Sequence, residues 1–122
     1  MGRRIMIVDD SGFMRMMIRK MLVKHGFEVV AEADNGVTAL EKYREFQPDL
    51  VLLDITMPKV NGIQALRNIK AEFPNVKAIM VSAMGQKPLV TEAIKAGAYD
   101  FVIKPFLEER VIETIRGILE DK

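Results

Sequence analysis

Five short segments along the chain have the residue pattern of β-strands, and each of them ends at a polar residue or a turn. They cover residues 3–8, 28–32, 50–53, 76–81 and 99–103. The run from Leu50 to Leu53 is hydrophobic throughout, and this pattern is typical of a strand that is buried on both faces of a parallel sheet. The segment 28–32 is more polar, so we expect it at an edge of the sheet.

Between these segments, hydrophobic residues recur at the spacing of amphipathic helices. We expect helices at about 12–25, 36–46, 62–73 and 87–96, and a last helix that buries residues 111, 112, 115, 118 and 119. In the first helix the predicted buried stripe consists of Met14, Met17, Ile18, Met21 and Leu22. Ser11 or Asp10 caps the start of this helix, and Gly26 ends it.

The alternation of strand and helix, repeated five times, predicts an α/β fold with a parallel sheet. Parallel strands are joined by right-handed crossovers, which place helices on both faces of the sheet. We therefore predict a flavodoxin-like, doubly wound (βα)5 architecture with five parallel strands in the order 2-1-3-4-5. At 122 residues, the chain is expected to form one domain over residues 1–122.

Composition and charge narrow the range of partners. The net charge of +1 gives no electrostatic field that favours nucleic acid or an anionic membrane, and the chain ends at its fifth helix, so we expect neither partner and no DNA-binding output domain. The absence of cysteine excludes disulfides, thiolate metal sites and cysteine nucleophiles. The apolar run from Ile5 to Val8 is too short for a signal peptide, and we expect a cytoplasmic monomer.

Acidic side chains stand where the first and third predicted strands end. Asp9 and Asp10 follow the first strand, and Asp54 follows the third. These strands are neighbours in the predicted order, so the three carboxylates should crowd one pocket at the edge where open α/β sheets bind ligands. Like charges raise one another's pKa, and a hard divalent cation such as Mg²⁺ relieves the repulsion because it prefers oxygen ligands.

Two further polar residues end the fourth and fifth strands. Ser82 provides a hydroxyl group, and Lys104 provides a mobile positive charge on the other flank of the pocket. Acids, Mg²⁺, a lysine and a serine around one carboxylate are suited to hold a phosphoryl group. Asp54 is the candidate nucleophile, because an aspartate can form an aspartyl phosphate. Taken singly, each of these residues is commonly a helix cap or a surface residue, and only their combination points to this chemistry.

Several short motifs stand at or beside the predicted strand ends. They are Val8-Asp9-Asp10, Leu53-Asp54-Ile55-Thr56-Met57-Pro58, Asn61-Gly62, Ser82-Ala83-Met84-Gly85-Gln86, Ala96-Gly97-Ala98 and Phe101-Val102-Ile103-Lys104-Pro105-Phe106. Each motif alone is weak, but in this order and over nearly the whole chain they are specific. The sequence resembles a bacterial two-component receiver domain, and within that family it is most similar to the single-domain chemotaxis response regulators.

This resemblance implies a phospho-accepting site with a metal ion. Asp54 would accept a phosphoryl group and become a 4-aspartyl phosphate. Mg²⁺ would be bound by Asp10, Asp54 and the main-chain carbonyl of Thr56, with Asp9 reaching it through water. The chain would be a signalling switch and not an enzyme in the usual sense, although it would promote its own phosphorylation and dephosphorylation.

The resemblance also implies how phosphorylation is sensed. Lys104 would pair with the phosphoryl oxygens, and the Ser82 hydroxyl would form a hydrogen bond with one of them. The Lys104–Pro105 peptide bond is cis in the family. The switch aromatic is Tyr in many chemotaxis regulators and is matched here by Phe101, which can change rotamer but offers no hydroxyl to a target. Ser82 and Phe101 would couple the site to the face formed by the fourth helix, fifth strand and fifth helix.

The partners follow from the same resemblance. The phosphoryl donor would be the phosphohistidine of a CheA-like histidine kinase, with small acyl phosphates as further donors. The target would be the flagellar motor switch protein, FliM or FliN. A phosphatase that acts on the phosphorylated regulator is a further expected partner.

Three alternatives stay open at this point. A phosphorelay intermediate of the same fold would pass the phosphoryl group to another histidine. A haloacid-dehalogenase-type phosphatase also uses a strand-end Asp, Mg²⁺ and a Lys, but it has a second Asp two positions after the nucleophile, where this chain has Thr56. A flavodoxin or nucleotide-binding module would need a phosphate-binding loop, and the loop after the first strand is acidic and lacks the glycine pattern.

Overall fold

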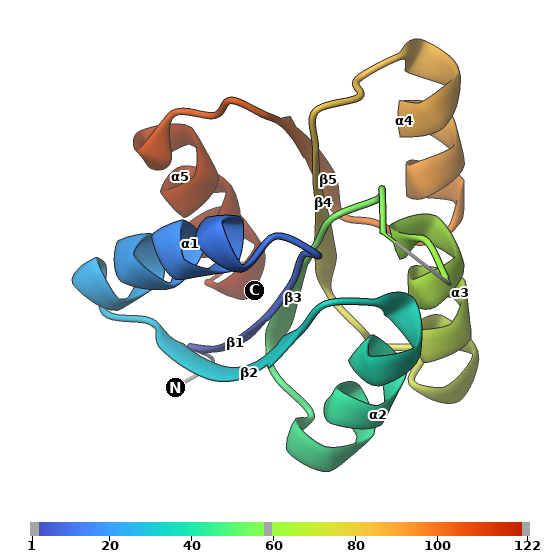
Figure 1. The fold of residues 1–122 in the computed structure, drawn as a ribbon, viewed down its shortest axis with the longest axis horizontal. Helices are drawn as coiled ribbons and strands as arrows, with labels where there is room; N and C mark the ends of the chain where they lie inside the picture. Colours follow the sequence, from blue (N-terminus) through green and yellow to red (C-terminus); the bar gives the residue numbers. More distant parts are fainter. Residues whose placement is uncertain (1–2, 58–59, 121–122) are drawn as a thin grey trace.

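The computed structural model describes residues 3–57 and 60–120, in which strands and helices alternate along the chain (Figure 1). The strands are β1 (Arg4–Val8), β2 (Glu28–Ala33), β3 (Leu50–Leu53), β4 (Ala78–Ser82) and β5 (Asp100–Ile103). The helices are α1 (Gly12–Lys24), α2 (Gly36–Phe46), α3 (Gly62–Glu72), α4 (Lys87–Lys95) and α5 (Glu108–Leu119). Each predicted element is present. Pro58, the last residue of the motif that begins at Leu53, lies outside the described residues.

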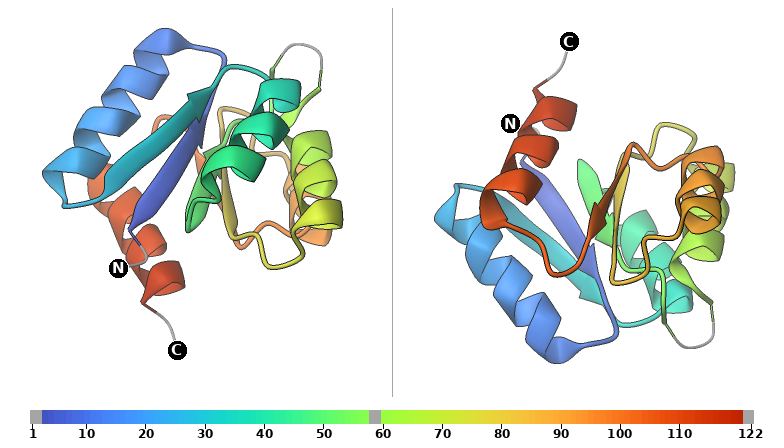
Figure 2. Two further views of the ribbon diagram at one scale, coloured as in Figure 1. Left: turned by 90° about the horizontal axis from the view of Figure 1, so that it is seen from below. Right: turned by 90° about the horizontal axis from the view of Figure 1, so that it is seen from above.

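The strands form one parallel sheet in the order β2-β1-β3-β4-β5, which confirms the predicted topology. The prediction that β2 lies at an edge is also confirmed. Helices α1 and α5 cover one face of the sheet, and α2, α3 and α4 cover the other (Figure 1, Figure 2). Val8 of β1 is in register with Leu53 of β3, so the residues that follow these strands leave the sheet side by side.

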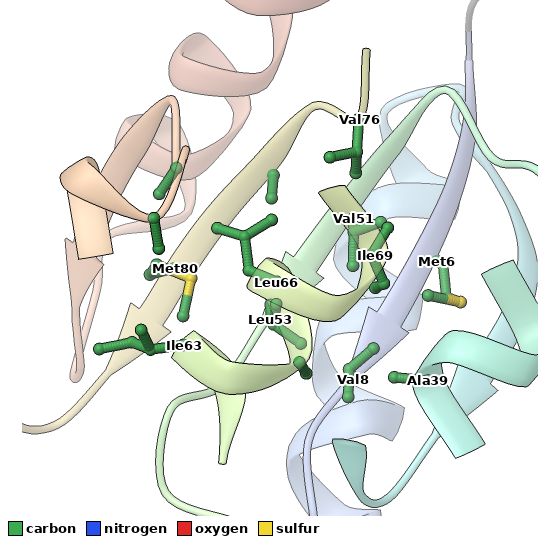
Figure 3. Packing of buried hydrophobic residues seen from close by; sticks show 14 of the residues in the cluster. Met6, Val8, Ala39, Val51, Leu53, Ile63, Leu66, Ile69, Val76 and Met80 are labelled. Atoms are coloured by element: carbon green, nitrogen blue, oxygen red, sulfur yellow. The ribbon is translucent and has the colours of Figure 1, made fainter. Parts of the chain in front are cut away.

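The alternation of side chains along the strands divides the core into two layers. The layer toward α2, α3 and α4 contains Met6, Val8, Val51, Leu53 and Met80 from the sheet and Ile63, Leu66 and Ile69 from α3 (Figure 3). The layer toward α1 and α5 contains Ile5, Ile7, Leu50, Leu52 and Ile79 from the sheet and Leu22, Ile112 and Ile115 from the helices. Strand β3 therefore supplies both layers, which explains why its sequence is hydrophobic without alternation.

Polar side chains cap three helices near the carboxyl edge of the sheet. The Ser11 hydroxyl accepts a hydrogen bond from the main-chain N–H of Met14 at 3.2 Å, so Ser11 is the cap of α1. Asn35 caps α2, and Asn61 caps α3. These caps satisfy N–H groups that a helix cannot pair internally, and they determine where each loop after a strand turns into a helix.

Two residues of the predicted buried stripe of α1 are not fully buried. Met14 is half-buried and packs against the core layer toward α1 and α5, whereas Met17 is 48% exposed, so the prediction is wrong for Met17. The buried residues of the helix are Ile18, Met21 and Leu22. Met17 lies at the margin of the stripe, where it lines an open groove together with Met14 and Phe106. The helical spacing is compatible with Met17 on the inner face of α1. The loop after β5, which lines the other side of the groove, does not cover the Met17 side chain.

None of the helices within residues 3–57 and 60–120 combines the length and the apolar character that a membrane crossing requires.

The loop after β3 packs tightly against the start of α3. The main-chain N–H of Gly62 donates a hydrogen bond to the carbonyl oxygen of Ile55 at 2.8 Å. A Cβ atom on Gly62 would overlap the carbonyl oxygen of Asp54, and it would lie 2.8 Å from the Cα atom of Ile55. Both neighbours are backbone atoms, which cannot turn aside as a side chain could. Only glycine therefore allows α3 to approach the segment that carries Asp54.

We expect the substitution Gly62→Ala to destabilise the protein by about 1–3 kcal/mol, because the added methyl group forces the backbone at Asp54 to move. Urea unfolding measures the effect. Gly117→Ala in α5 is the matched control, since a Cβ atom there meets nothing within 4 Å. That change should stabilise the protein by up to about 1 kcal/mol through helix propensity. Equal stabilities of the two variants would contradict the prediction.

Candidate functional site

Three carboxylates meet at the carboxyl edge of the sheet. Asp9 and Asp10 follow β1, Asp54 follows β3, and one carboxylate oxygen from each lies within 4.8 Å of the other two. Asp9 and Asp54 are buried, with 2% and 6% of their surface exposed, whereas Asp10 is exposed. The structure thus brings together the three acids that the sequence places at neighbouring strand ends.

The carboxylate of Asp9 is held from two sides. Its Oδ1 atom accepts a hydrogen bond from the main-chain N–H of Ser11 at 2.9 Å. Its Oδ2 atom accepts a hydrogen bond from Lys104 Nζ at 2.9 Å, whereas the same ammonium group lies 3.7 Å from Asp54 Oδ1. Lys104 follows β5 and reaches across the edge of the sheet to the acids. In this structure the ammonium group is therefore bonded to Asp9 and only near Asp54.

Burial raises the pKa of Asp54 from 3.8 to about 6. The largest cause is the loss of water around the carboxylate; Lys104 acts in the opposite direction, and Asp9 and Asp10 raise the pKa further. One ammonium group thus does not compensate three neighbouring carboxylates. The site has an excess of negative charge, which favours the binding of a cation.

The donor set of this site fits a hard divalent cation. Carboxylate oxygens from three residues converge, with one of the residues open to solvent, and Mg²⁺ is bound in proteins by one or two carboxylates together with water or phosphate oxygens. Thr56, the residue expected to add a main-chain carbonyl, is exposed. Its hydroxyl group donates a hydrogen bond to the sulfur atom of Met84 at 3.7 Å.

The structure places Ser82 and Phe101 on neighbouring strands. Ser82 ends β4, is 1% exposed, and its hydroxyl oxygen accepts a hydrogen bond from the main-chain N–H of Met84 at 3.1 Å. Phe101 of β5 is 8% exposed and belongs to the core layer beneath α4. Its ring is therefore directed inward. The peptide bond between Lys104 and Pro105 is cis, as the family resemblance implies.

Arg15 is a neighbour of the site that the sequence did not reveal. Its guanidinium group donates a hydrogen bond to the main-chain carbonyl of Asp9 at 2.6 Å. An arginine six positions after an aspartate carries no distinctive sequence signal, because the contact exists only once α1 folds back against β1. The spacing could have suggested that Arg15 lies within the first turns of the helix, but not that it reaches the loop.

The parallel sheet, the acidic cluster at its carboxyl edge and the lysine from β5 define a class of protein. The sequence model of the response regulator receiver domain matches residues 5–116, and the chain belongs to this family. The resemblance drawn from the motifs at the strand ends is thereby confirmed.

Several of the similar proteins are named as chemotaxis proteins. The chain is 58% identical to the chemotaxis protein CheY of Bacillus subtilis (strain 168) over 119 residues, which cover 98% of this chain and 99% of that protein. It is 53% identical to CheY of Thermotoga maritima over 118 residues, covering 97% of this chain and 98% of that protein. By this similarity the chain is a CheY-like response regulator.

A solved structure shows the same architecture. In the crystal structure of a CheX–CheY–BeF3–Mg²⁺ complex from Borrelia burgdorferi, the matched chain has a TM-score of 0.92 and 35% sequence identity. The match covers 94% of this chain and 87% of that chain. The flavodoxin-like receiver fold is thus shared at the level of the whole domain.

We expect Asp54→Asn to stabilise the metal-free protein at pH 7 by about 1–3 kcal/mol, since each pKa unit corresponds to about 1.4 kcal/mol. The pKa of Asp54 is raised to about 6 in the folded state, so this carboxyl group retains its proton on folding between about pH 4 and pH 6. The stability of the wild type relative to the variant should therefore fall as the pH rises through this range, and then stay constant. Urea unfolding in EDTA between pH 4 and pH 8 measures the difference.

Mg²⁺ provides the control for this experiment. It should stabilise the wild type at pH 7 more than it stabilises Asp54→Asn, because the variant has one carboxylate fewer in the acidic cluster. A variant that is less stable than the wild type at pH 7 in EDTA would show that the buried carboxylate is compensated within the protein.

Proposed function

We propose that the protein is a phosphorylation-activated response regulator of chemotaxis, in which Asp54 accepts a phosphoryl group from the phosphohistidine of a CheA-like kinase. The observation that carries this proposal is a buried carboxylate, 6% exposed, with two more acids and one lysine beside it at the edge of a parallel sheet. The similarity to CheY proteins supports the chemotaxis assignment. The functional unit in this proposal is a single receiver domain over residues 1–122.

The reaction is a displacement at phosphorus. An oxygen of Asp54 attacks the phosphoryl group, the new O–P bond forms as the N–P bond to the donor histidine breaks, and the electron pair of the broken bond returns to the imidazole ring. In this proposal Asp10, Asp54 and the main-chain carbonyl of Thr56 hold Mg²⁺, and Asp9 contributes through water. The cation neutralises charge on the phosphoryl oxygens when it is bound.

Lys104 then changes its partner. In the structure its ammonium group is bonded to Asp9 and lies 3.7 Å from Asp54, so a small movement brings it to a phosphoryl oxygen on Asp54. The Ser82 hydroxyl, which accepts from the N–H of Met84, has a proton of its own to donate to another phosphoryl oxygen. Ser82 ends β4, which pairs with β5, and Lys104 follows β5, the strand that contains Phe101. In this proposal, movement of Ser82 and Lys104 alters the space available to the Phe101 ring.

The output in this proposal is a remodelled face formed by α4, β5 and α5, which binds the flagellar motor switch protein, FliM or FliN. Phe101 contributes bulk and no hydroxyl group, so target binding would depend on its rotamer and not on a hydrogen bond from it. We further propose that a CheY-phosphatase ends the signal and that the protein acts as a cytoplasmic monomer. The protein acts as a switch that promotes its own phosphorylation and dephosphorylation.

Labelling with acetyl phosphate tests the acceptor. We expect the wild type to gain one phosphoryl group in the presence of Mg²⁺, and to gain none in EDTA, as measured by intact-protein mass spectrometry. Asp54→Ala should remain unlabelled. Asp34→Ala is the matched control, because Asp34 also follows a strand but is exposed and outside the acidic cluster. A label that persists in Asp54→Ala would mean that another residue is the acceptor.

Phosphorylation alone should shift the conformation incompletely. A charge-assisted hydrogen bond contributes about 1.5–3 kcal/mol, whereas a change from 1:99 to 99:1 needs about 5.5 kcal/mol. We therefore expect NMR spectra of the phosphorylated protein to show exchange between two states at residues of β5 and α4. The exchange should be suppressed when a target peptide is added. A single active state without target would contradict this expectation.

A further inference from the structure

An ion-pair network joins α1 and β2 beside the acidic cluster. Glu32 of β2 accepts hydrogen bonds from two arginines of α1: from Arg15 Nε at 3.1 Å to one carboxylate oxygen, and from Arg19 Nε at 2.8 Å to the other. The Arg15 side chain is 23% exposed and the Arg19 side chain is 48% exposed. Only Arg15 extends further, because its Nη1 atom donates to the main-chain carbonyl of Asp9 at 2.6 Å.

The orientation of the Asp9 carbonyl group affects how the loop between β1 and α1 presents the next residue, Asp10. The carbonyl of Asp9 and the N–H of Asp10 belong to one rigid peptide plane, so a bond to the carbonyl determines the direction in which the chain presents Asp10. Asp9 itself is held independently: its main-chain N–H donates a hydrogen bond to the carbonyl of Ala33, and its carboxylate accepts hydrogen bonds from the main-chain N–H of Ser11 and from Lys104 Nζ. Asp10 is exposed. Its placement therefore depends on the backbone, and Arg15 supplies a bond to that backbone.

Glu32 also compensates the positive charge of Arg15 beside the acidic cluster. An uncompensated guanidinium group so close to the acidic cluster would compete electrostatically with a divalent cation. The carboxylate of Glu32 neutralises Arg15 while leaving its Nη1 atom free to bond to the Asp9 carbonyl. The Arg15–Glu32 pair thus provides a rigid hydrogen-bond donor to the loop without a net charge of its own. The positive charge that the network retains lies on Arg19, the more exposed of the two arginines.

We propose that Arg15 is a positioning residue for divalent-cation binding: held by Glu32, it orients the Asp9–Asp10 peptide group so that the Asp10 carboxylate joins those of Asp9 and Asp54. This inference rests on the proposed function, because it assumes that the cluster binds Mg²⁺. Partners that orient metal ligands typically change metal affinity by about 10–100-fold when they are removed. Since Arg15 acts on the backbone of the ligand residue, we expect an effect at the lower end of this range.

Binding of Mg²⁺ alone, measured by isothermal titration calorimetry at 25 °C, tests the inference. Arg15→Met keeps the length of the side chain and removes its donors, and it should weaken Mg²⁺ binding about tenfold. Arg15→Lys can reach one of the two partners and should show an intermediate affinity. Arg19→Met is the matched control, because it removes an ion pair to the same glutamate without touching the Asp9 carbonyl. It should change the affinity less than twofold.

A merely structural role for Arg15 would give a different pattern. It would lower the urea midpoint of Arg15→Met and leave the Mg²⁺ affinity of the folded protein unchanged. In our proposal, raised Mg²⁺ should restore the rate at which acetyl phosphate labels Arg15→Met, because Asp54 and Lys104 are intact. Equal Mg²⁺ affinities of Arg15→Met and Arg19→Met would overturn the inference, as would a labelling defect that saturating Mg²⁺ does not repair.

The proposed function and this inference fail in distinguishable ways. A wild type that binds no Mg²⁺ refutes the proposed function and the inference with it, whereas a wild type that binds Mg²⁺ but is not labelled at Asp54 refutes the proposed function alone. A wild type that binds Mg²⁺ and is labelled, with an Arg15→Met variant of unchanged affinity, refutes the inference alone. If Arg15→Met does not fold, Arg15→Lys decides, because a Mg²⁺ affinity equal to that of the wild type would contradict the intermediate affinity expected for it.

Discussion

The architecture depends on the compensation of negative charge at the carboxyl ends of β1 and β3. Asp9 and Asp54 are both buried, and Asp10 adds a third carboxylate within 4.8 Å. Burying carboxylates without partners is costly, and a single ammonium group from Lys104 compensates this cluster only in part. The raised pKa of Asp54 reflects that imbalance. A protein selected for stability alone would have little reason to retain three such acids together, and the excess negative charge favours the binding of a cation.

The rest of the fold supplies the rigidity that such a site requires. Strand β3, buried on both faces, delivers Asp54 from the centre of the sheet. Gly62 allows α3 to pack directly on the backbone of Asp54, and Ser11 both caps α1 and donates its N–H to Asp9. The charged side chains are thus held by main-chain contacts at the edge of a close-packed core. Loops of this kind can present like charges together because their backbones cannot relax apart.

In the proposed function, the same arrangement would couple phosphorylation of Asp54 to a distant face. Lys104 and Ser82 stand at the ends of adjacent strands, and the N–H of Lys104 donates to the carbonyl of Ser82 at 2.8 Å. Phe101 lies on β5 three residues before Lys104, and its ring is buried in the layer under α4. A change at the end of β4 or β5 therefore alters the packing of a ring whose neighbours form the proposed output face. Interiors packed at this density respond by switching between arrangements more readily than by gradual deformation.

Much of this protein could be predicted from the sequence, because the relevant signals are local. Hydrophobic periodicity, cap residues and the rule of right-handed crossovers together predict the strand order, and the strand order alone brings Asp9, Asp10 and Asp54 to one edge. The tertiary structure decided the details that depend on distances between elements remote in the chain. Met17 is exposed beside an open groove. Lys104 Nζ lies 2.9 Å from a carboxylate oxygen of Asp9 but 3.7 Å from one of Asp54. Arg15 donates a hydrogen bond to the Asp9 carbonyl. Sequence spacing reports which face of an element a residue occupies, whereas the partner it meets there depends on how closely the elements pack.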